Sequence, residues 1–74
     1  MSIVELVLRG EHIALDALLK ATGLAQSGGS AKRLIADGQV RVDGQIEARK
    51  TCKIRAGQRV ALGDACVDVV AGPR

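Results

Sequence analysis

The 74-residue sequence contains no Trp, Tyr or Phe, and it has only one His and two Cys. Without aromatic rings, the chain cannot bind nucleic acid by stacking bases on an aromatic platform. A zinc site within one chain would need carboxylates as well as these residues, and no ligand spacing indicates one. A disulfide is disfavoured in a cytoplasmic protein. We therefore expect no metal and no cofactor.

The sequence also has no long apolar run, and its first residues do not resemble a signal peptide. No stretch approaches the ~18 apolar residues that span a bilayer, and the first twelve residues carry Glu5 but lack the basic segment of a signal peptide. Hydrophobic residues nevertheless make up 47% of the chain and charged residues 26%, which is typical of a folded domain. We expect one soluble, cytoplasmic and monomeric domain over residues 1–74, with a core of residues 3–70 and no membrane contact.

Catalytic constellations are scarce. His12 is the only histidine, so any Ser–His or Cys–His pair would depend on it. The glycines at 28 and 29 match neither a Walker A loop nor a dinucleotide fingerprint, and a chain this short lacks the walls of a closed pocket of ~300 Å³. We expect no enzymatic activity. Cys52 and Cys66 are expected to be inert, although the cations around Cys52 would favour its thiolate.

The net charge is +3 and the sequence pI about 9.3, and the charge is unevenly distributed. Residues 32–59 hold eight basic and three acidic side chains, a net charge of +5, whereas the remainder carries −2. The basic residues are Lys32, Arg33, Arg41, Arg49, Lys50, Lys53, Arg55 and Arg59. Such asymmetry favours a polyanionic partner, and an ordinary solvated surface is the alternative.

The apolar pattern predicts two short helices. Leu15, Leu18, Leu19 and Thr22 share one helical face over residues 15–22, and Gly23 follows as a stop signal. Ser27 is a suitable N-cap for a second helix over residues 28–37, whose apolar positions are 31, 34 and 35 and which ends at the glycine at 38.

The remaining segments predict strands. Residues 2–8, 40–42, 45–47, 59–62 and 66–70 are β-branched, apolar or alternating, and Asp43-Gly44 is a hairpin signal. Residues 48–53 form a basic connector, and turns are expected at residues 56–57 and 63–64. The order predicts an α+β fold with two short helices packed on a small, curved, mostly antiparallel sheet.

The start of the second helix is the strongest candidate site. Ser27, Gly28, Gly29 and Ser30 open this helix, where free backbone N–H groups and the helix dipole favour an anion. The glycines leave the backbone open to a phosphate, the serines add hydroxyl donors, and Lys32 and Arg33 add cations. In the alternative interpretation, this is an ordinary capped helix whose glycines only permit a tight turn.

The later cations extend this candidate surface. Arg41 alternates with two valines, so its side chain is expected to point away from the core; alone, it would be an ordinary solvated strand charge. Together with Arg49, Lys50, Lys53 and Arg55, it makes a continuous basic surface more plausible. Arg33 and Asp37 are spaced for an ion pair along the helix, worth about 0.3–0.5 kcal/mol.

Residues 13–44 resemble the RNA-binding domain first described in ribosomal small-subunit protein S-four, the αL motif. The matching residues are Leu15-Asp16, Gly23, Ser27, Ala31-Lys32-Arg33-Leu34-Ile35 and Gly38-x-Val40-x-Val42-Asp43-Gly44. The whole chain is similar to the small stand-alone bacterial YbcJ-like family over roughly residues 3–70. The shared features are Ser27-Gly28-Gly29, Leu19-Lys20 and Arg49-Lys50…Lys53 before Gly57.

The resemblance implies a bacterial, translation-associated protein that binds structured RNA, of the ribosomal or transfer RNA class, through phosphate contacts. It carries this role onto Lys32, Arg33, Arg41, Arg49, Lys50 and Lys53. Many larger members place Arg directly after the helix-opening serine, where this chain has Gly28, so one family cation is missing. The alternative function is an accessory module that docks its basic face on an acidic or ribosomal protein.

Overall fold

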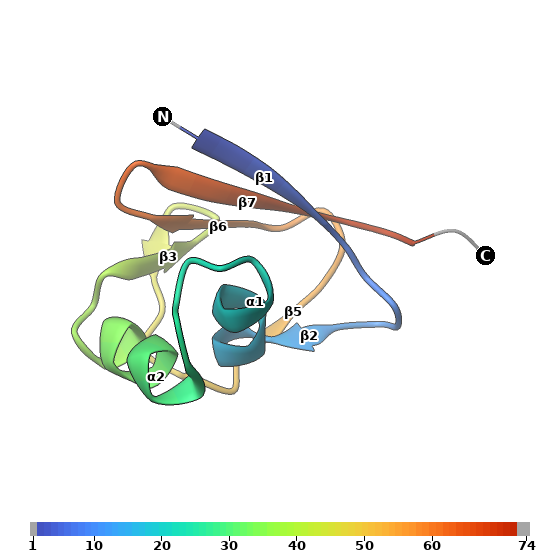
Figure 1. The fold of residues 1–74 in the computed structure, drawn as a ribbon. Helices are drawn as coiled ribbons and strands as arrows, with labels where there is room; N and C mark the ends of the chain where they lie inside the picture. Colours follow the sequence, from blue (N-terminus) through green and yellow to red (C-terminus); the bar gives the residue numbers. More distant parts are fainter. Residues whose placement is uncertain (1, 73–74) are drawn as a thin grey trace.

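Seven strands and two helices make up the described part of the computed structural model, residues 2–72. A five-stranded sheet has the order β1 (Ser2–Val7), β7 (Ala65–Val70), β6 (Arg59–Leu62), β3 (Val40–Val42), β4 (Gln45–Ile46). A separate pair joins β2 (Ile13–Ala14) to β5 (Lys53–Ile54). The helices are α1 (Leu15–Ala21) and α2 (Gly28–Ala36), and both lie on one side of the larger sheet (Figure 1). The predicted α+β architecture is confirmed.

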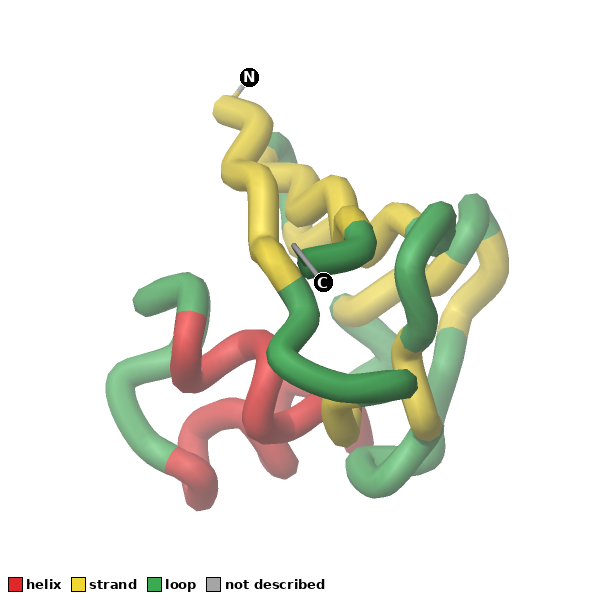
Figure 2. The backbone as a smooth tube through the Cα atoms, turned by 90° about the vertical axis from the view of Figure 1, so that its right-hand side faces the viewer, coloured by secondary structure: helices red, strands yellow, loops and turns green. Residues whose placement is uncertain are grey.

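Strand pairing is antiparallel except at one edge. β3 pairs antiparallel with both β4 and β6, and β6 pairs antiparallel with β7, whereas β1 pairs parallel with β7. Parallel neighbours need a long connection between them. Here that connection is almost the whole chain, because β1 and β7 are the first and last strands. The tube view shows the helices gathered apart from these strands (Figure 2).

The helical stripe of α1 is buried as expected. Leu15, Leu18 and Leu19 are completely shielded from solvent, and they pack with Ala31 and Ile35 of α2 in one hydrophobic core. Spacing of three and four residues brings such side chains to one face of a helix. Truncating a buried side chain of this size to alanine typically costs about 2–5 kcal/mol of unfolding free energy.

The caps of α2 follow the sequence signals. The Ser27 hydroxyl oxygen accepts the backbone N–H of Ser30 at 3.1 Å, which satisfies one N–H group that the helix cannot bond internally. At the other end, Gly38 has a φ of 74°, a left-handed conformation that glycine adopts without steric cost. Serine and glycine therefore define α2 from Gly28 to Ala36, one residue shorter than predicted.

The predicted hairpin forms at Asp43-Gly44. Both residues have positive φ, 53° and 85°, as a two-residue turn between twisted antiparallel strands requires. The Asp43 carboxylate also accepts the backbone N–H of Arg59 at 3.0 Å and the side-chain amide of Gln58 at 3.2 Å. These hydrogen bonds fix the turn to the start of β6, which is the strand that pairs with β3.

Side chains alternate between the two faces of the large sheet. Val40, Val60 and Val67 are completely buried and share the core with the helices. Arg41, Ala61 and Cys66 are register partners across β3, β6 and β7, so they lie together on the opposite face. We call this the outer face of the sheet. Within the described residues, neither helix has the length and apolar character needed to cross a lipid bilayer.

Candidate nucleic-acid interface

The first turn of α2 presents open backbone. Gly28 and Gly29 have no positive φ, and a Cβ added at Gly28 would meet no atom within 4 Å. At Gly29 the nearest atom would be the Ser27 hydroxyl oxygen, at an ordinary 3.9 Å. The fold therefore has no conformational or packing need for either glycine. Alanine would fit at both positions and would favour the helix. The need for a tight turn therefore does not explain why glycine stands there.

Two N–H groups at this helix start are available to a ligand. The amide of Ser30 is bonded to Ser27, and that of Ala31 donates to the Ser27 carbonyl at 3.0 Å. The amides of Gly28 and Gly29 donate to no other described group. Unpaired N–H groups at the positive end of a helix dipole form an anion-binding site.

Lys32 and Arg33 are exposed in the turns that follow. The two ion pairs among residues 2–72 join Arg49 to Glu47 and Arg59 to Asp68, so both α2 cations remain unpaired there. The Arg33–Asp37 ion pair, which the spacing would permit, is not one of these two pairs. An exposed, unpaired cation next to free amides strengthens the attraction of this helix end for an anion.

The connector, which we define as residues 47–52, folds back onto the start of α1. Its Cys52 and Lys50 carbonyl oxygens accept the backbone N–H groups of Leu15 at 2.9 Å and Asp16 at 3.0 Å. Ala14, the N-cap residue of α1, provides no side-chain cap, so these carbonyls replace one. These bonds hold the backbone of Lys50, whose side chain is exposed, at the N-terminal end of α1.

The sequence placed Lys53 in the connector, but in the structure this residue begins β5. It is the register partner of Ala14 in β2, and it is exposed beside the buried Ile54. The pairing therefore brings Lys53 to the same end of α1 as Lys50. Two-residue strands leave no alternation in the sequence, which explains why β2 and β5 were not predicted.

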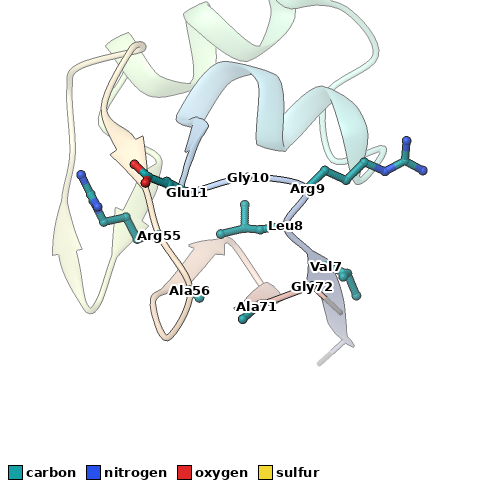
Figure 3. Close-up of a pocket in the computed structure, with 9 residues that line it drawn as sticks. All are labelled: Val7, Leu8, Arg9, Gly10, Glu11, Arg55, Ala56, Ala71 and Gly72. Atoms are coloured by element: carbon teal, nitrogen blue, oxygen red, sulfur yellow. The ribbon is translucent and has the colours of Figure 1, made fainter. Parts of the chain in front are cut away.

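Arg41 and Arg55 lie elsewhere. Arg41 is exposed, as predicted, but it belongs to the outer face of the sheet, opposite the helices. Arg55 follows β5 and lines a hollow together with Leu8, Glu11 and Ala71, and its side chain extends along the rim (Figure 3). Arg41 thus lies on the face of the sheet opposite α2, and Arg55 belongs to the hollow beside Leu8.

The basic residues thus form two groups along the helix pair. The start of α2 adjoins the end of α1, because Ala25 between the helices donates its N–H to the Leu19 carbonyl at 3.0 Å. The connector contacts the opposite end of α1. Seven helical residues separate these ends by about 10 Å. Instead of the continuous basic surface expected from the sequence, the structure gives an elongated surface along the helix pair. We call it the helix-end surface: residues 27–33 lie at one end, with Arg49, Lys50 and Lys53 at the other.

Glu47 was missed as a functional candidate. Its carboxylate accepts hydrogen bonds from the backbone N–H and the guanidinium of Arg49, and this contact lowers the pKa of Glu47 to about 2. Burial, with Glu47 close by, raises the pKa of the Cys52 thiol, contrary to the suggestion that nearby cations favour its thiolate. The only sign of this contact in the sequence is that Glu47 stands just before a basic run. The spacing of two residues between Glu47 and Arg49 is not typical of an ion pair within a helix.

Comparison with known proteins identifies the family of this chain. The model of the S4 domain family matches residues 6–70. The chain is 53% identical over 60 residues to YbcJ of Escherichia coli (strain K12), provisionally named as an RNA-binding protein, covering 81% of this chain and 86% of that one. An uncharacterized YbcJ of Shigella flexneri matches with the same identity and coverage.

A solved structure is also similar. The solution structure of YbcJ from E. coli, described as revealing an αL motif involved in RNA-binding, superposes with a TM-score of 0.69 and 48% sequence identity. The match covers 96% of this chain and 89% of that one. The two helices and the mostly antiparallel sheet are thus shared.

Proposed function

The chain belongs to the S4 domain family, and from this premise we propose that it is a non-enzymatic RNA-binding protein that holds structured RNA by its phosphate backbone. The RNA belongs to the ribosomal or transfer RNA class, and binding takes place in the cytoplasm by a monomer. The helix-end surface makes the contacts. Its α2 end bonds one phosphate group, and its connector end attracts another part of the same backbone.

The observation that carries this proposal is the pair of glycines at the start of α2. Neither glycine is required by backbone conformation or by packing. Among residues 2–72, their N–H groups have no acceptor and the nearby Lys32 and Arg33 form no ion pair. A phosphate oxygen is the ligand that matches this combination of donors and charge. Helix N-termini contribute such contacts in many nucleic-acid complexes.

Recognition depends on shape and charge. The chain has no aromatic ring to stack bases, and the deep major groove of A-form RNA excludes side chains. Phosphate contacts position a protein without reading sequence. Arg41 and Arg55 are proposed as contacts for an RNA long enough to extend beyond the helix pair.

The salt dependence of binding tests this proposal. A labelled RNA hairpin is titrated with the protein at several salt concentrations. The logarithm of the affinity is expected to fall linearly with the logarithm of salt, by about 0.7 for each phosphate contact on single-stranded segments. An affinity that does not change with salt would contradict the proposal.

Docking on an acidic protein would also depend on salt, so a second measurement separates the two functions. The chain has almost no intrinsic absorbance at 280 nm because it lacks Trp and Tyr. RNA that copurifies from cells would therefore dominate the ultraviolet spectrum with a maximum near 260 nm, and ribonuclease would remove it. Purified protein without this absorbance that captures an acidic protein partner would favour the accessory module.

A further inference from the structure

Glu47 is an acidic side chain within the connector end of the basic helix-end surface. By charge alone it should oppose RNA, because its carboxylate repels phosphate. Its removal would then improve binding. The contacts of Glu47 indicate the opposite effect.

The carboxylate of Glu47 is turned inward and is occupied by its neighbour. One oxygen, Oε1, accepts both the backbone N–H of Arg49 at 3.0 Å and its Nε at 3.2 Å, while Oε2 lies 3.5 Å from Nη2. The Glu47 side chain is 19% exposed, whereas that of Arg49 is 78% exposed. The negative charge is therefore covered by the guanidinium, which faces the solvent.

A chain of backbone hydrogen bonds leads from Glu47 to α1. The Glu47 N–H donates to the Val40 carbonyl at 3.1 Å, which fixes this residue next to β3. The Cys52 N–H donates to the Arg49 carbonyl at 3.2 Å, which closes the connector into a turn. Two carbonyls of that turn then accept the first N–H groups of α1. Glu47 thus bonds the residue at which the turn begins.

From these contacts we propose that Glu47 is a positioning residue for RNA binding, which holds the connector turn against α1 so that the backbone presents Lys50 next to Lys53 for phosphate contact. This inference rests on the proposed function. It also gives Arg49 a second role, as the partner that neutralises Glu47. A connector turn that is already ordered in the free protein loses less conformational entropy when it binds.

Removal of the Glu47 carboxylate from this basic surface is thus expected to weaken the binding of a polyanion, although it makes the net charge more positive. Glu47→Ala removes both the charge and the acceptor atoms. Glu47→Gln removes the charge but keeps one acceptor for the Arg49 N–H. Asp37→Ala is the matched control, because Asp37 is exposed beyond α2 and its carboxylate takes part in no ion pair among the described residues.

The experiment titrates a labelled RNA hairpin with the full chain and each variant at one salt concentration. Glu47→Ala is expected to bind up to about fivefold more weakly than the wild type, and Glu47→Gln to lie between them. Asp37→Ala is expected to bind equally or more tightly. Amide hydrogen exchange at Leu15 and Asp16, measured without RNA, is expected to accelerate in Glu47→Ala, and circular dichroism verifies that each variant is folded.

Glu47→Ala binding as tightly as the wild type, or more tightly, would overturn the inference. Weaker binding without faster exchange at Leu15 and Asp16 would overturn it as well, because the connector would then still be in place. Absence of binding by the wild type would contradict the proposed function itself, so the two failures are distinguishable.

Discussion

The carbonyl oxygen of Cys52 accepts the backbone N–H of Leu15 at 2.9 Å, which joins the end of the connector to the first residue of α1. These residues are distant in sequence, and neither side chain indicates the contact. It places the connector cations at one end of α1, while the start of α2 lies at the other. The proposed binding surface therefore depends on a backbone contact that no side-chain pattern encodes.

The cations of α2 are expected to contribute separately to the salt dependence of RNA binding. Lys32→Ala and Arg33→Ala should each reduce the slope of log affinity against log salt by about 0.7, because each removes one phosphate contact. Arg59→Gln is the matched control. It also removes one positive charge, but from a residue bonded to Asp68 at 3.1 Å on the outer face. An equal loss of slope in all three variants would indicate a nonspecific effect of net charge.

Gly28→Ala should separate stability from binding. The methyl group has free space around it, and alanine favours a helix over glycine, so the variant should be more stable by up to about 1 kcal/mol. RNA affinity should fall, because the methyl group obstructs the approach of a phosphate to the free amides. Thermal unfolding followed by circular dichroism gives the stability, and RNA titration gives the affinity. If the stabilised variant binds RNA as tightly as the wild type, Gly28 is not needed for a phosphate to approach the backbone amides.

Two substitutions of the Ser27 cap are expected to differ. Ser27→Ala deletes the acceptor for the Ser30 N–H and should cost about 1 kcal/mol of unfolding free energy. Ser27→Asp keeps an acceptor and should preserve stability, but its charge would compete with the phosphate and lower RNA affinity. Chemical denaturation and RNA titration of both variants test this. Normal RNA binding by Ser27→Asp would exclude a phosphate at this helix end.

Acid should destabilise the fold through Glu47. Its pKa is held at about 2 by Arg49, below the value of 4.5 for an unperturbed glutamate. The unfolded chain therefore binds a proton at Glu47 more readily than the folded protein does. The contribution of Glu47 to the free energy of unfolding is present above about pH 4.5 and is lost as the pH falls toward 2. Melting temperatures between these pH values should fall less steeply in Glu47→Gln than in the wild type. Parallel curves would show that Glu47 has no altered pKa in the folded protein.

The sequence predicts the features that are encoded locally. Ser27 and Gly38 limit α2 because a hydroxyl cap and a left-handed glycine act within one turn. Asp43-Gly44 predicts its hairpin for the same reason. Burial of Leu15, Leu18 and Leu19 follows from their periodic spacing alone. Each of these predictions is confirmed.

The contacts that shape the candidate site are long-range and leave no such signal. The alternation around Arg41 predicts that its side chain is exposed, but it does not reveal that the exposed face is opposite α2. The pairing of Lys53 with Ala14 depends on two-residue strands, which are too short to show a period. The sequence therefore proposes the residues of the candidate site, but only the structure shows how they are placed relative to α1.

Mapping the bound surface by amide chemical shifts tests the central claim most directly. Isotope-labelled protein is titrated with an RNA hairpin, and the shift of every backbone amide is followed. The largest changes are expected at Gly28, Gly29 and Ser30, with a second group at Lys50 and Lys53, and little change at Ala61 on the outer face. Shifts confined to the outer face, with the α2 amides unmoved, would contradict phosphate binding at this helix.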